Sequence, residues 1–184
     1  MSSPLPPRTV LVTGAARRLG RAFSLAFARA GWDVACHYQH SRDEALQTCA
    51  EIEALGRKAW AIAGDMADAA AQQAVFSQAV QAIGQWPDAI VNNASLFEPD
   101  TGLDFSPELL QQQMQVNLVA PLHLAALLAR AVHQAPAGRP APAVVHVLDQ
   151  KVFNLNPDYF SYTLTKLALE RAVAMLREEV RNAY

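Results

Sequence analysis

Residues 8–29, RTVLVTGAARRLGRAFSLAFAR, decide the fold of this chain. The stretch begins with a short apolar run at residues 10–12, passes through Gly14 and Gly20, and continues with apolar residues at helical spacing from Phe23 onward. This order predicts a strand, a glycine turn and a helix. Taken alone, the stretch also fits an ordinary strand–helix turn with solvated arginines, so the rest of the chain has to decide.

The two glycines of this turn have separate conformational roles. Gly14 can adopt backbone angles that a Cβ atom would forbid, and Gly20 lets the helix pack closely against the sheet. The helix N-terminus then directs unpaired N–H groups and the positive end of its dipole at the space above the strand. Arg17, Arg18 and Arg21 add positive charge beside it. The turn therefore favours a bound pyrophosphate.

Length and composition indicate one globular domain. The chain has 184 residues, of which 52% are hydrophobic and 17% charged, enough for a sizeable core. The net charge of −2 gives no reason to expect nucleic acid as a partner. Cys36 and Cys49 fall in a predicted strand and a predicted helix, and are expected to be buried thiols rather than a disulfide or metal site.

Localisation follows from the absence of targeting signals. The N-terminal MSSPLPPR contains no apolar core of signal-peptide length. The most apolar segment, residues 118–131, is interrupted by Pro121, His123 and Arg130, and is shorter than the roughly 20 residues that span a bilayer. We expect a cytoplasmic protein with no membrane partner.

Strand and helix signals alternate along the chain. Strands are expected at residues 10–12, 32–38, 58–63, 88–91 and 143–148, and helices after the glycine turn and at residues 42–55, 68–83, 107–134 and 160–181, with a bend at Pro121 and a loop at residues 135–142. This alternation predicts an α/β fold, a Rossmann-type doubly wound parallel sheet, with residues 1–184 as a single domain. The ligand crevice should lie above strands one and four, where the winding reverses.

The segment after the second strand, residues 37–41, bears on the choice of cofactor. A free ribose 2′-hydroxyl would call for an acidic residue about twenty positions after the first turn. No such residue lies between Asp33 and Asp43. His40, Ser41 and Arg18 could instead bind a 2′-phosphate, which favours NADPH. A polar loop with a helix cap at Ser41 is the alternative.

Two further segments bring chemistry to the crevice. Small polar residues at 92–95 allow close approach of a ribose or ring, and Phe97 offers an aromatic face to a planar substrate, unless it is a core residue. Tyr162 and Lys166 are four residues apart and share one helix face. A lysine cation beside a phenol should lower the pKa of the phenol and create a proton-transfer pair, although YxxxK alone also fits two solvated residues.

The combination TGxxxxxG, NNA, Asn117 within a helix, and YxxxK resembles the short-chain dehydrogenase/reductase family over essentially the whole chain. The resemblance implies that Tyr162 exchanges the proton, that Lys166 holds the nicotinamide ribose, and that Asn117 supports a water relay. It makes Asp149, Tyr162, Lys166 and Asn117 the candidate catalytic residues. It places NADPH or NADP⁺ against Gly14, Arg17, Arg18, Leu19, Gly20, His37, Tyr38, His40, Ser41, Asp65, Met66, Asn93, Ala94, Ser95, Tyr162 and Lys166.

Departures from the common family pattern narrow the resemblance. Arg18 stands where most members have glycine, and Asp149 stands where most have a serine thirteen residues before the tyrosine. With HYxxS and Phe97, these features look like the pteridine reductases and the related dihydromonapterin and dihydrofolate reductases. That subgroup implies a pterin or folate substrate held by Arg18, Ser95, Phe97, Asp149 and Tyr162.

The chemistry of the substrate independently favours the aspartate. A pterin is reduced at a C=N bond, so a ring nitrogen needs a proton and the amino group offers donors to a carboxylate. Asp149 as a mere cap or ion-pair partner is the alternative. The wider alternatives for the chain are a general carbonyl reductase and a catalytically silent NADP(H)-binding module.

The chain stops at Tyr184, whereas the family continues with a sixth strand, a substrate-covering segment and a seventh strand. We therefore expect a truncated domain without the substrate lid. The broad apolar faces of the helices at 107–134 and 160–181 resemble those that form the family's dimer interface, which implies a homodimer or homotetramer.

Overall fold

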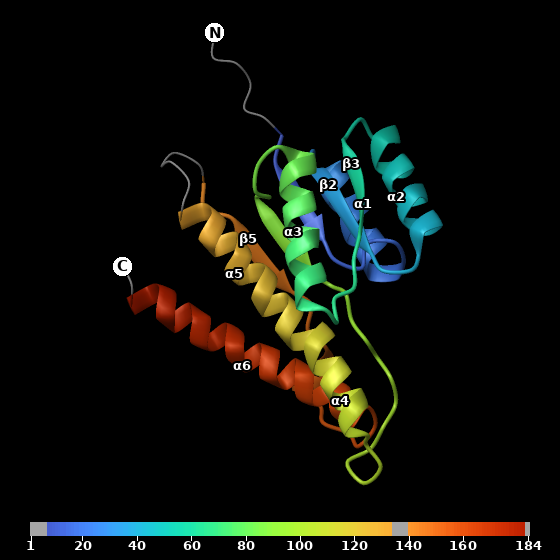
Figure 1. The fold of residues 1–184 in the computed structure, drawn as a ribbon, viewed down its shortest axis with the longest axis vertical. Coiled ribbons are helices and arrows are strands. Elements are labelled where there is room, and N and C mark those ends of the chain that lie inside the picture. Colours follow the sequence, from blue (N-terminus) through green and yellow to red (C-terminus); the bar gives the residue numbers. More distant parts are fainter. Residues whose placement is uncertain (1–6, 134–139, 183–184) are drawn as a thin grey trace.

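The computed structural model describes residues 7–133 and 140–182, and it is a parallel sheet covered by helices on both faces (Figure 1). The strands are β1 (Thr9–Val12), β2 (Asp33–Tyr38), β3 (Ala59–Ala63), β4 (Ala89–Asn92) and β5 (Ala143–His146). The helices are α1 (Arg18–Arg29), α2 (Arg42–Ala54), α3 (Ala69–Ile83), α4 (Pro107–Met114), α5 (Ala120–His133) and α6 (Phe160–Asn182), with a π-helical turn at Gln115–Val119 and a 3₁₀ turn at Gln150–Val152.

The strand order is β3-β2-β1-β4-β5, and every pairing is parallel. The winding reverses between β1 and β4, so the prediction of a doubly wound Rossmann-type sheet is confirmed. The carboxyl ends of β1 and β4 lie side by side, with Val12 opposite Val91. The crevice of such a sheet opens at this point.

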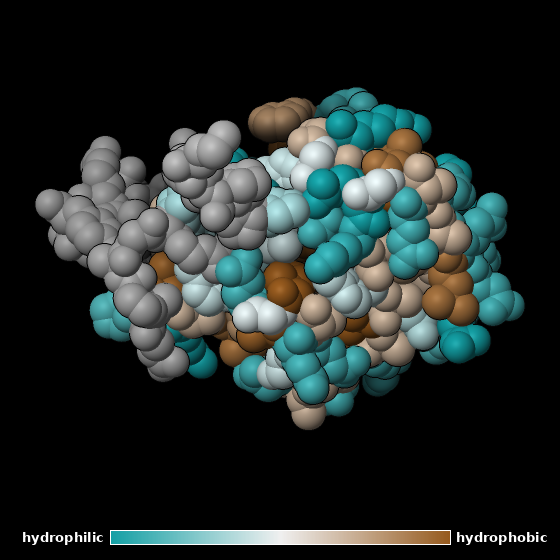
Figure 2. Space-filling model, turned by 90° about the horizontal axis from the view of Figure 1, so that it is seen from above, coloured by the Kyte–Doolittle hydropathy of each residue, from teal (hydrophilic) through white to brown (hydrophobic). Residues whose placement is uncertain are grey.

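Alternating residues of β1 supply the two halves of the core. Val10 and Val12 pack with residues of α1 and α2, including Leu25 and Ile52, on one face. Leu11 packs with residues of α3 and α5, including Leu124, on the other. Both Cys36 and Cys49 are free and buried in the first of these clusters, as expected. Seen from above, hydrophobic and hydrophilic residues are interspersed on the surface of the described part (Figure 2).

The long helical stretch that begins at Pro107 differs from the expected bent helix. Ser106 caps it through its hydroxyl, which accepts from the Leu109 N–H at 3.2 Å, in the predicted cap-then-proline order. The irregularity, however, is a π-helical turn at Gln115–Val119 rather than a simple bend at Pro121, and the Ala120 N–H reaches the Gln115 carbonyl. Pro121 has no N–H to donate and crowds the carbonyl four residues earlier, which favours one wide turn just before it.

The apolar character of this stretch is used in the core. Pro107–His133 is long and apolar enough, by length and composition, to cross a membrane, with a mean hydropathy of 1.4 in its most apolar window. In the structure it packs on α3, α6 and β4, and Leu124 and Leu128 are buried. The same composition therefore serves as a core helix here. Residues 134–139, which hold most of the expected loop, lie outside the described residues.

Candidate active site

The glycine turn between β1 and α1 has almost no room for side chains. Gly14 has a φ of +65°, and a Cβ atom there would lie 3.0 Å from the Cα of Ala94. A Cβ atom on Gly20 would lie 1.9 Å from the Gly14 carbonyl oxygen. Both glycines are thus required by close approach, as the sequence predicted.

His37 holds this turn in place from below. Its Nδ1 accepts from the Gly14 N–H at 3.1 Å, and its Nε2 lies 3.1 Å from the Gly64 carbonyl, to which it donates as the neutral tautomer. The ring is 1% exposed, and burial lowers the pKa of His37 to about 4. His37, which was predicted to contact the cofactor, therefore borders the cavity, but both of its ring nitrogens are hydrogen-bonded to the backbone, so its role is to hold the shape of the turn.

Thr13 and Asn93 tie the β1 turn to the loop after β4. The Thr13 hydroxyl accepts from the N–H groups of Asn93 and Ala94 at 2.9 and 3.0 Å. The Asn93 amide donates in return to the carbonyls of Thr13 and Gly14 at 3.0 and 3.2 Å. These bonds fix the floor of the crevice.

The helix N-termini at the crevice differ from the others in how they are capped. Asp68 and Ser106 cap α3 and α4 through side-chain hydrogen bonds. Arg17 and Ser41, at the N-cap positions of α1 and α2, make no such bond. The first-turn N–H groups that a side-chain cap would satisfy thus remain available to an anion, as phosphate binding requires, although the Arg42 N–H donates to the His40 carbonyl at 3.0 Å.

Arg18 begins α1 with a φ of +50°, in the left-handed region that favours glycine. A non-glycine residue there is strained, and such strain concentrates at functional sites. This backbone conformation agrees with the family resemblance of the sequence, in which Arg18 stands where most members have glycine.

Two adjoining cavities extend along the carboxyl ends of the strands. The larger, of about 610 Å³, is lined by Gly14, Ala16, Arg17, His37, Tyr38, Gln39, His40, Ser41, Asp65, Met66, Ala67, Ala94, Ser95, Leu96, Gln112 and Val116. The smaller, of about 390 Å³, is lined by Gly14, Arg17, Arg18, Leu19, Gly20, Asn93, Ala94 and Ser95. Together these sets contain the predicted cofactor residues other than Tyr162 and Lys166.

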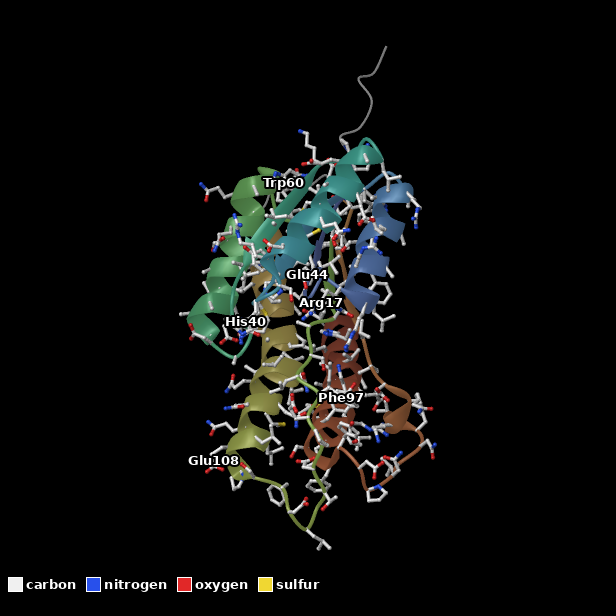
Figure 3. All side chains as sticks on the ribbon, turned by 90° about the vertical axis from the view of Figure 1, so that its right-hand side faces the viewer. Arg17, His40, Glu44, Trp60, Phe97 and Glu108 are labelled. Carbon is white, nitrogen blue, oxygen red and sulfur yellow. The ribbon has the colours of Figure 1, made fainter. Side chains whose placement is uncertain are left out.

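Within the larger cavity the structure corrects one grouping. Arg17, not Arg18, lies with His40 and Ser41, while Arg18 lines the smaller cavity. Arg17 faces the N-terminus of α2 and pairs with Glu44 at 3.5 Å, both side chains being substantially exposed. Figure 3 shows Arg17 and Glu44 next to each other, with Phe97 farther along toward α4.

Asp149, Tyr162 and Lys166 come together where β5 meets α6. The Tyr162 hydroxyl donates to the Asp149 carboxylate at 3.0 Å, and the second carboxylate oxygen accepts from the Lys151 N–H at 2.9 Å. The Lys166 ammonium donates to the Val147 carbonyl at 2.8 Å and lies 5.5 Å from the centre of the Tyr162 ring. The predicted constellation is thus assembled by the fold.

The electrostatics of this group correct one expectation. Burial, and then the neighbouring Asp149 carboxylate, raise the pKa of Tyr162 above its usual value, so the predicted lowering by lysine is wrong in this structure. Burial lowers the pKa of Lys166 to about 8. The phenol is therefore held protonated beside a lysine that is 4% exposed.

Asn117 lies in the π-helical turn and is fully buried. Its Oδ1 accepts from the Ser95 hydroxyl at 3.1 Å and the Leu96 N–H at 2.8 Å, and its Nδ2 donates to the Leu96 carbonyl at 2.8 Å. The side chain therefore fixes the start of the loop after β4, and its role in a water relay stays a prediction.

Phe97 is not a core residue, since it is 48% exposed. Its ring stacks on Tyr159 with centroids 4.0 Å apart and an angle of 4°, and it meets Tyr162 edge-on at 4.6 Å. An aromatic surface thus borders the proton-transfer group. Tyr159 was missed from the sequence, and its position three residues before Tyr162 is the signal that would have found it.

Lys151 was also missed from the sequence. Its ammonium is 8% exposed and is held by Asn156 and by the Asp158 carbonyl, the latter at 3.2 Å. These bonds shape the loop that leads from Asp149 to α6. No sequence motif marks this lysine, because its partners are neutral oxygens within a loop.

Comparison with protein families gives one clear match. Residues 8–183 match the model described as short chain dehydrogenase. Over 114 residues the chain is 40% identical to an L-rhamnose 1-dehydrogenase (NAD(P)(+)) from Sphingomonas, and the aligned region covers 62% of this chain and 44% of that protein. It is 27% identical over 183 residues to General stress protein 39 from Bacillus subtilis, of which it covers 62%. The chain thus spans less than two thirds of these relatives.

Solved structures with bound NADP are similar over nearly the whole chain. One is the FolM alternative dihydrofolate reductase 1 from Brucella suis, with a TM-score of 0.85, 34% identity, and coverage of 94% of this chain and 69% of that one. Another is the landomycin C-6 ketoreductase LanV with NADP and rabelomycin, with a TM-score of 0.83, 27% identity, and coverage of 95% and 71%.

Proposed function

The chain belongs to the short-chain dehydrogenase family, and on that premise we propose that it is an NADPH-dependent reductase of a pterin or folate-like C=N bond. The observation that supports this most is the 3.0 Å hydrogen bond from Tyr162 to Asp149, beside the exposed ring of Phe97. It joins a proton donor, a carboxylate and a stacking surface at one end of the crevice. The similarity to the Brucella dihydrofolate reductase agrees with this assignment.

The cofactor fits the residues that line the two cavities. We assign its pyrophosphate to the uncapped N-terminus of α1 above Gly14 and Gly20, where N–H groups and the helix dipole favour an anion. Arg17, with His40 and Ser41 at the uncapped α2, suits a 2′-phosphate, which is the reason to prefer NADPH. When bound, NADPH supplies the hydride.

The chain's own residues supply the proton and the substrate contacts. Tyr162 donates its proton to the substrate nitrogen, and its raised pKa keeps the phenol protonated for that step. The Asp149 carboxylate accepts N–H donors from an amino-substituted ring. Lys166 holds a positive charge close to the phenol and stabilises negative charge that develops on it. Phe97 stacks on the ring.

A general carbonyl reductase is the second candidate, and Ser95 is the observation that favours it. The Ser95 hydroxyl, which donates to the Asn117 Oδ1, opposes the rise in the pKa of Tyr162, so a hydroxyl lies near the phenol. Such a hydroxyl could stabilise the oxyanion that forms when a ketone is reduced. The similarity to the LanV ketoreductase fits this chemistry.

The decisive experiment follows the loss of NADPH absorbance with dihydrobiopterin, dihydrofolate and an aromatic ketone. The wild-type chain is compared with Tyr162→Phe and Asp149→Ala, and with Asp104→Ala as a control on an exposed loop carboxylate. The proposal is supported if the wild-type chain and the control turn over dihydrobiopterin or dihydrofolate and both active-site variants do not. Turnover of the ketone alone, tolerant of Asp149→Ala, indicates the carbonyl reductase.

A third outcome of the same experiment identifies a non-catalytic protein. Saturable NADPH binding without turnover, unchanged by Tyr162→Phe, indicates a silent binding module and refutes both reductase functions. The binding is followed by the quenching of tryptophan fluorescence.

We also propose that the protein acts in the cytoplasm as a homodimer or homotetramer. The helical stretch Pro107–His133 and α6 would form the interface, and exposed apolar side chains on α6, including Leu164 and Met175, support this. Sedimentation velocity at micromolar concentration tests it, and a monomer there contradicts it.

A further inference from the structure

The N-terminus of α6, the helix that carries Tyr162 and Lys166, obtains its cap from a distant part of the chain. The preceding residue, Tyr159, has a φ of +55° and cannot act as an ordinary N-cap side chain. Instead, the N–H of Phe160 donates to the Asp100 carbonyl at 3.2 Å, and the N–H of Ser161 donates to the Asp100 carboxylate at 3.0 Å. Asp100 lies in the irregular loop between β4 and α4.

The Asp100 carboxylate is committed to this helix. Its second oxygen is buried and has no partner among the described residues. Ser161, whose N–H it accepts, is itself fully buried. A carboxylate at this position also interacts favourably with the positive end of the helix dipole. The contact therefore stabilises the first turn of α6 in two ways.

The same loop carries the stacking surface of the candidate active site. Phe97, three residues before Asp100, stacks on Tyr159 and meets Tyr162 edge-on. Phe105, at the other end of the loop, lies 5.6 Å from the Phe160 ring. Figure 1 shows this loop running from β4 to α4 past the beginning of α6. Asp100 is the hydrogen-bonded point between these aromatic contacts.

We propose that Asp100 is a positioning residue that fixes the proton donor Tyr162 relative to the stacking surface of Phe97. The inference rests on the proposed reductase function. Tyr162 is the third residue of α6, so loosening of the first turn moves its hydroxyl away from Asp149. Most residues that line the cofactor cavities follow β1, β2 and β3, and the start of the loop after β4, which also lines them, is held at Ser95 and Leu96 by Asn117 rather than by Asp100. Loss of this cap should therefore affect turnover and substrate binding more than NADPH affinity.

Three variants test the proposal. Asp100→Ala removes the side-chain acceptor, and Asp100→Asn keeps a carbonyl oxygen that can accept from Ser161. Asp104→Ala is the matched control, since the Asp104 carboxylate lies in the same loop but accepts from Thr101, at 2.7 Å, rather than from α6. The measurements are kcat and KM for the substrate and the dissociation constant of NADPH.

We expect Asp100→Ala to lower kcat by at least about tenfold and raise the substrate KM, since displacements near 1 Å at a reacting group have effects of this size or larger. NADPH affinity should stay within about twofold, and Asp100→Asn should recover most of the lost kcat. Wild-type kinetics in Asp100→Ala would overturn the proposal. So would a parallel loss of NADPH affinity, or an equal loss in Asp104→Ala.

Amide hydrogen exchange separates this proposal from the proposed function. The Ser161 N–H should be protected in the wild-type chain and in Asp104→Ala, and should exchange much faster in Asp100→Ala, which removes its acceptor. Absence of turnover with every substrate refutes the proposed function, while exchange at Ser161 still decides whether the Asp100 side chain holds the start of α6. Equal exchange in all variants refutes the cap.

Discussion

Acidification should destabilise this protein through His37, whose ring takes no part in the proposed proton transfer. The ring accepts from Gly14 through Nδ1 and donates to Gly64 through Nε2, so the folded chain needs the neutral imidazole. A second proton would remove the acceptor and place a charge in a site that is 1% exposed. The lowered pKa of His37, about 4 against an ordinary 6.5, expresses this.

The size and sign of the effect follow from these two values. Because the pKa is lower in the folded chain, the unfolded chain binds the proton first as the pH falls, and stability is lost from about pH 6.5 downward. With an unfolded value of 6.5 and a folded value of about 4, His37 should contribute a loss of about 2 kcal/mol by pH 5. The loss approaches about 3 kcal/mol below pH 4.

Urea unfolding at pH 7 and pH 5, followed by tryptophan fluorescence, measures this contribution. His37→Asn removes the titrating group and should lose about 2 kcal/mol less stability between the two pH values than the wild-type chain. His40→Asn, a change of an exposed histidine, should keep the wild-type pH dependence. Equal pH dependence in wild type and His37→Asn would refute the reasoning.

Three further predictions address the cofactor site and the proton donor. Gly20→Ala should abolish NADPH binding and destabilise the fold by about 1–3 kcal/mol, because the added Cβ would lie 1.9 Å from the Gly14 carbonyl oxygen. Calorimetric titration with NADPH and a thermal melt measure the two effects, and wild-type affinity would contradict the prediction. Glu44→Gln should release Arg17 and strengthen NADPH binding without changing NADH binding; the gain should be only about two- to fivefold, because an exposed ion pair at 3.5 Å is weak. Fluorescence titration with both cofactors measures this, and an equal gain for NADH would argue against a 2′-phosphate site. Reduction should slow as the pH rises through about 8, where the Lys166 ammonium loses its proton, and a pH–rate profile that stays flat to pH 9.5 would count against the role of this charge. The free energy of unfolding should rise from about pH 8 toward 10.5, because in this range the unfolded chain keeps a proton that the folded chain has lost.

Local sequence was sufficient for the elements and for the turn. The apolar run in β1, the glycines at 14 and 20 and the helical spacing that follows lie within one short segment, and their conformational preferences act wherever that segment is placed. The same holds for Tyr162 and Lys166, because a separation of four residues puts both on one face of any helix. The alternation of strands and helices then leaves the doubly wound sheet as the expected arrangement.

Properties that depend on burial and on distant partners required the tertiary structure. The pKa of Tyr162 rises because the fold buries it against Asp149, although YxxxK alone predicted a decrease. His37 became a backbone support once Gly14 and Gly64 were placed on either side of it. Asp100 became a helix cap across a separation of sixty-one residues from Ser161.

One physical reason separates the properties that local sequence determines from those that need the tertiary structure. Propensity, spacing and steric freedom are properties of contiguous residues, so the sequence by itself determined the strand–turn–helix unit, the order of elements and the residue types at the crevice. Desolvation, hydrogen-bond partnership and charge proximity depend on which segments meet. Only the tertiary structure could therefore decide the protonation of Tyr162, the pairing of Arg17 with Glu44 and the cap on α6.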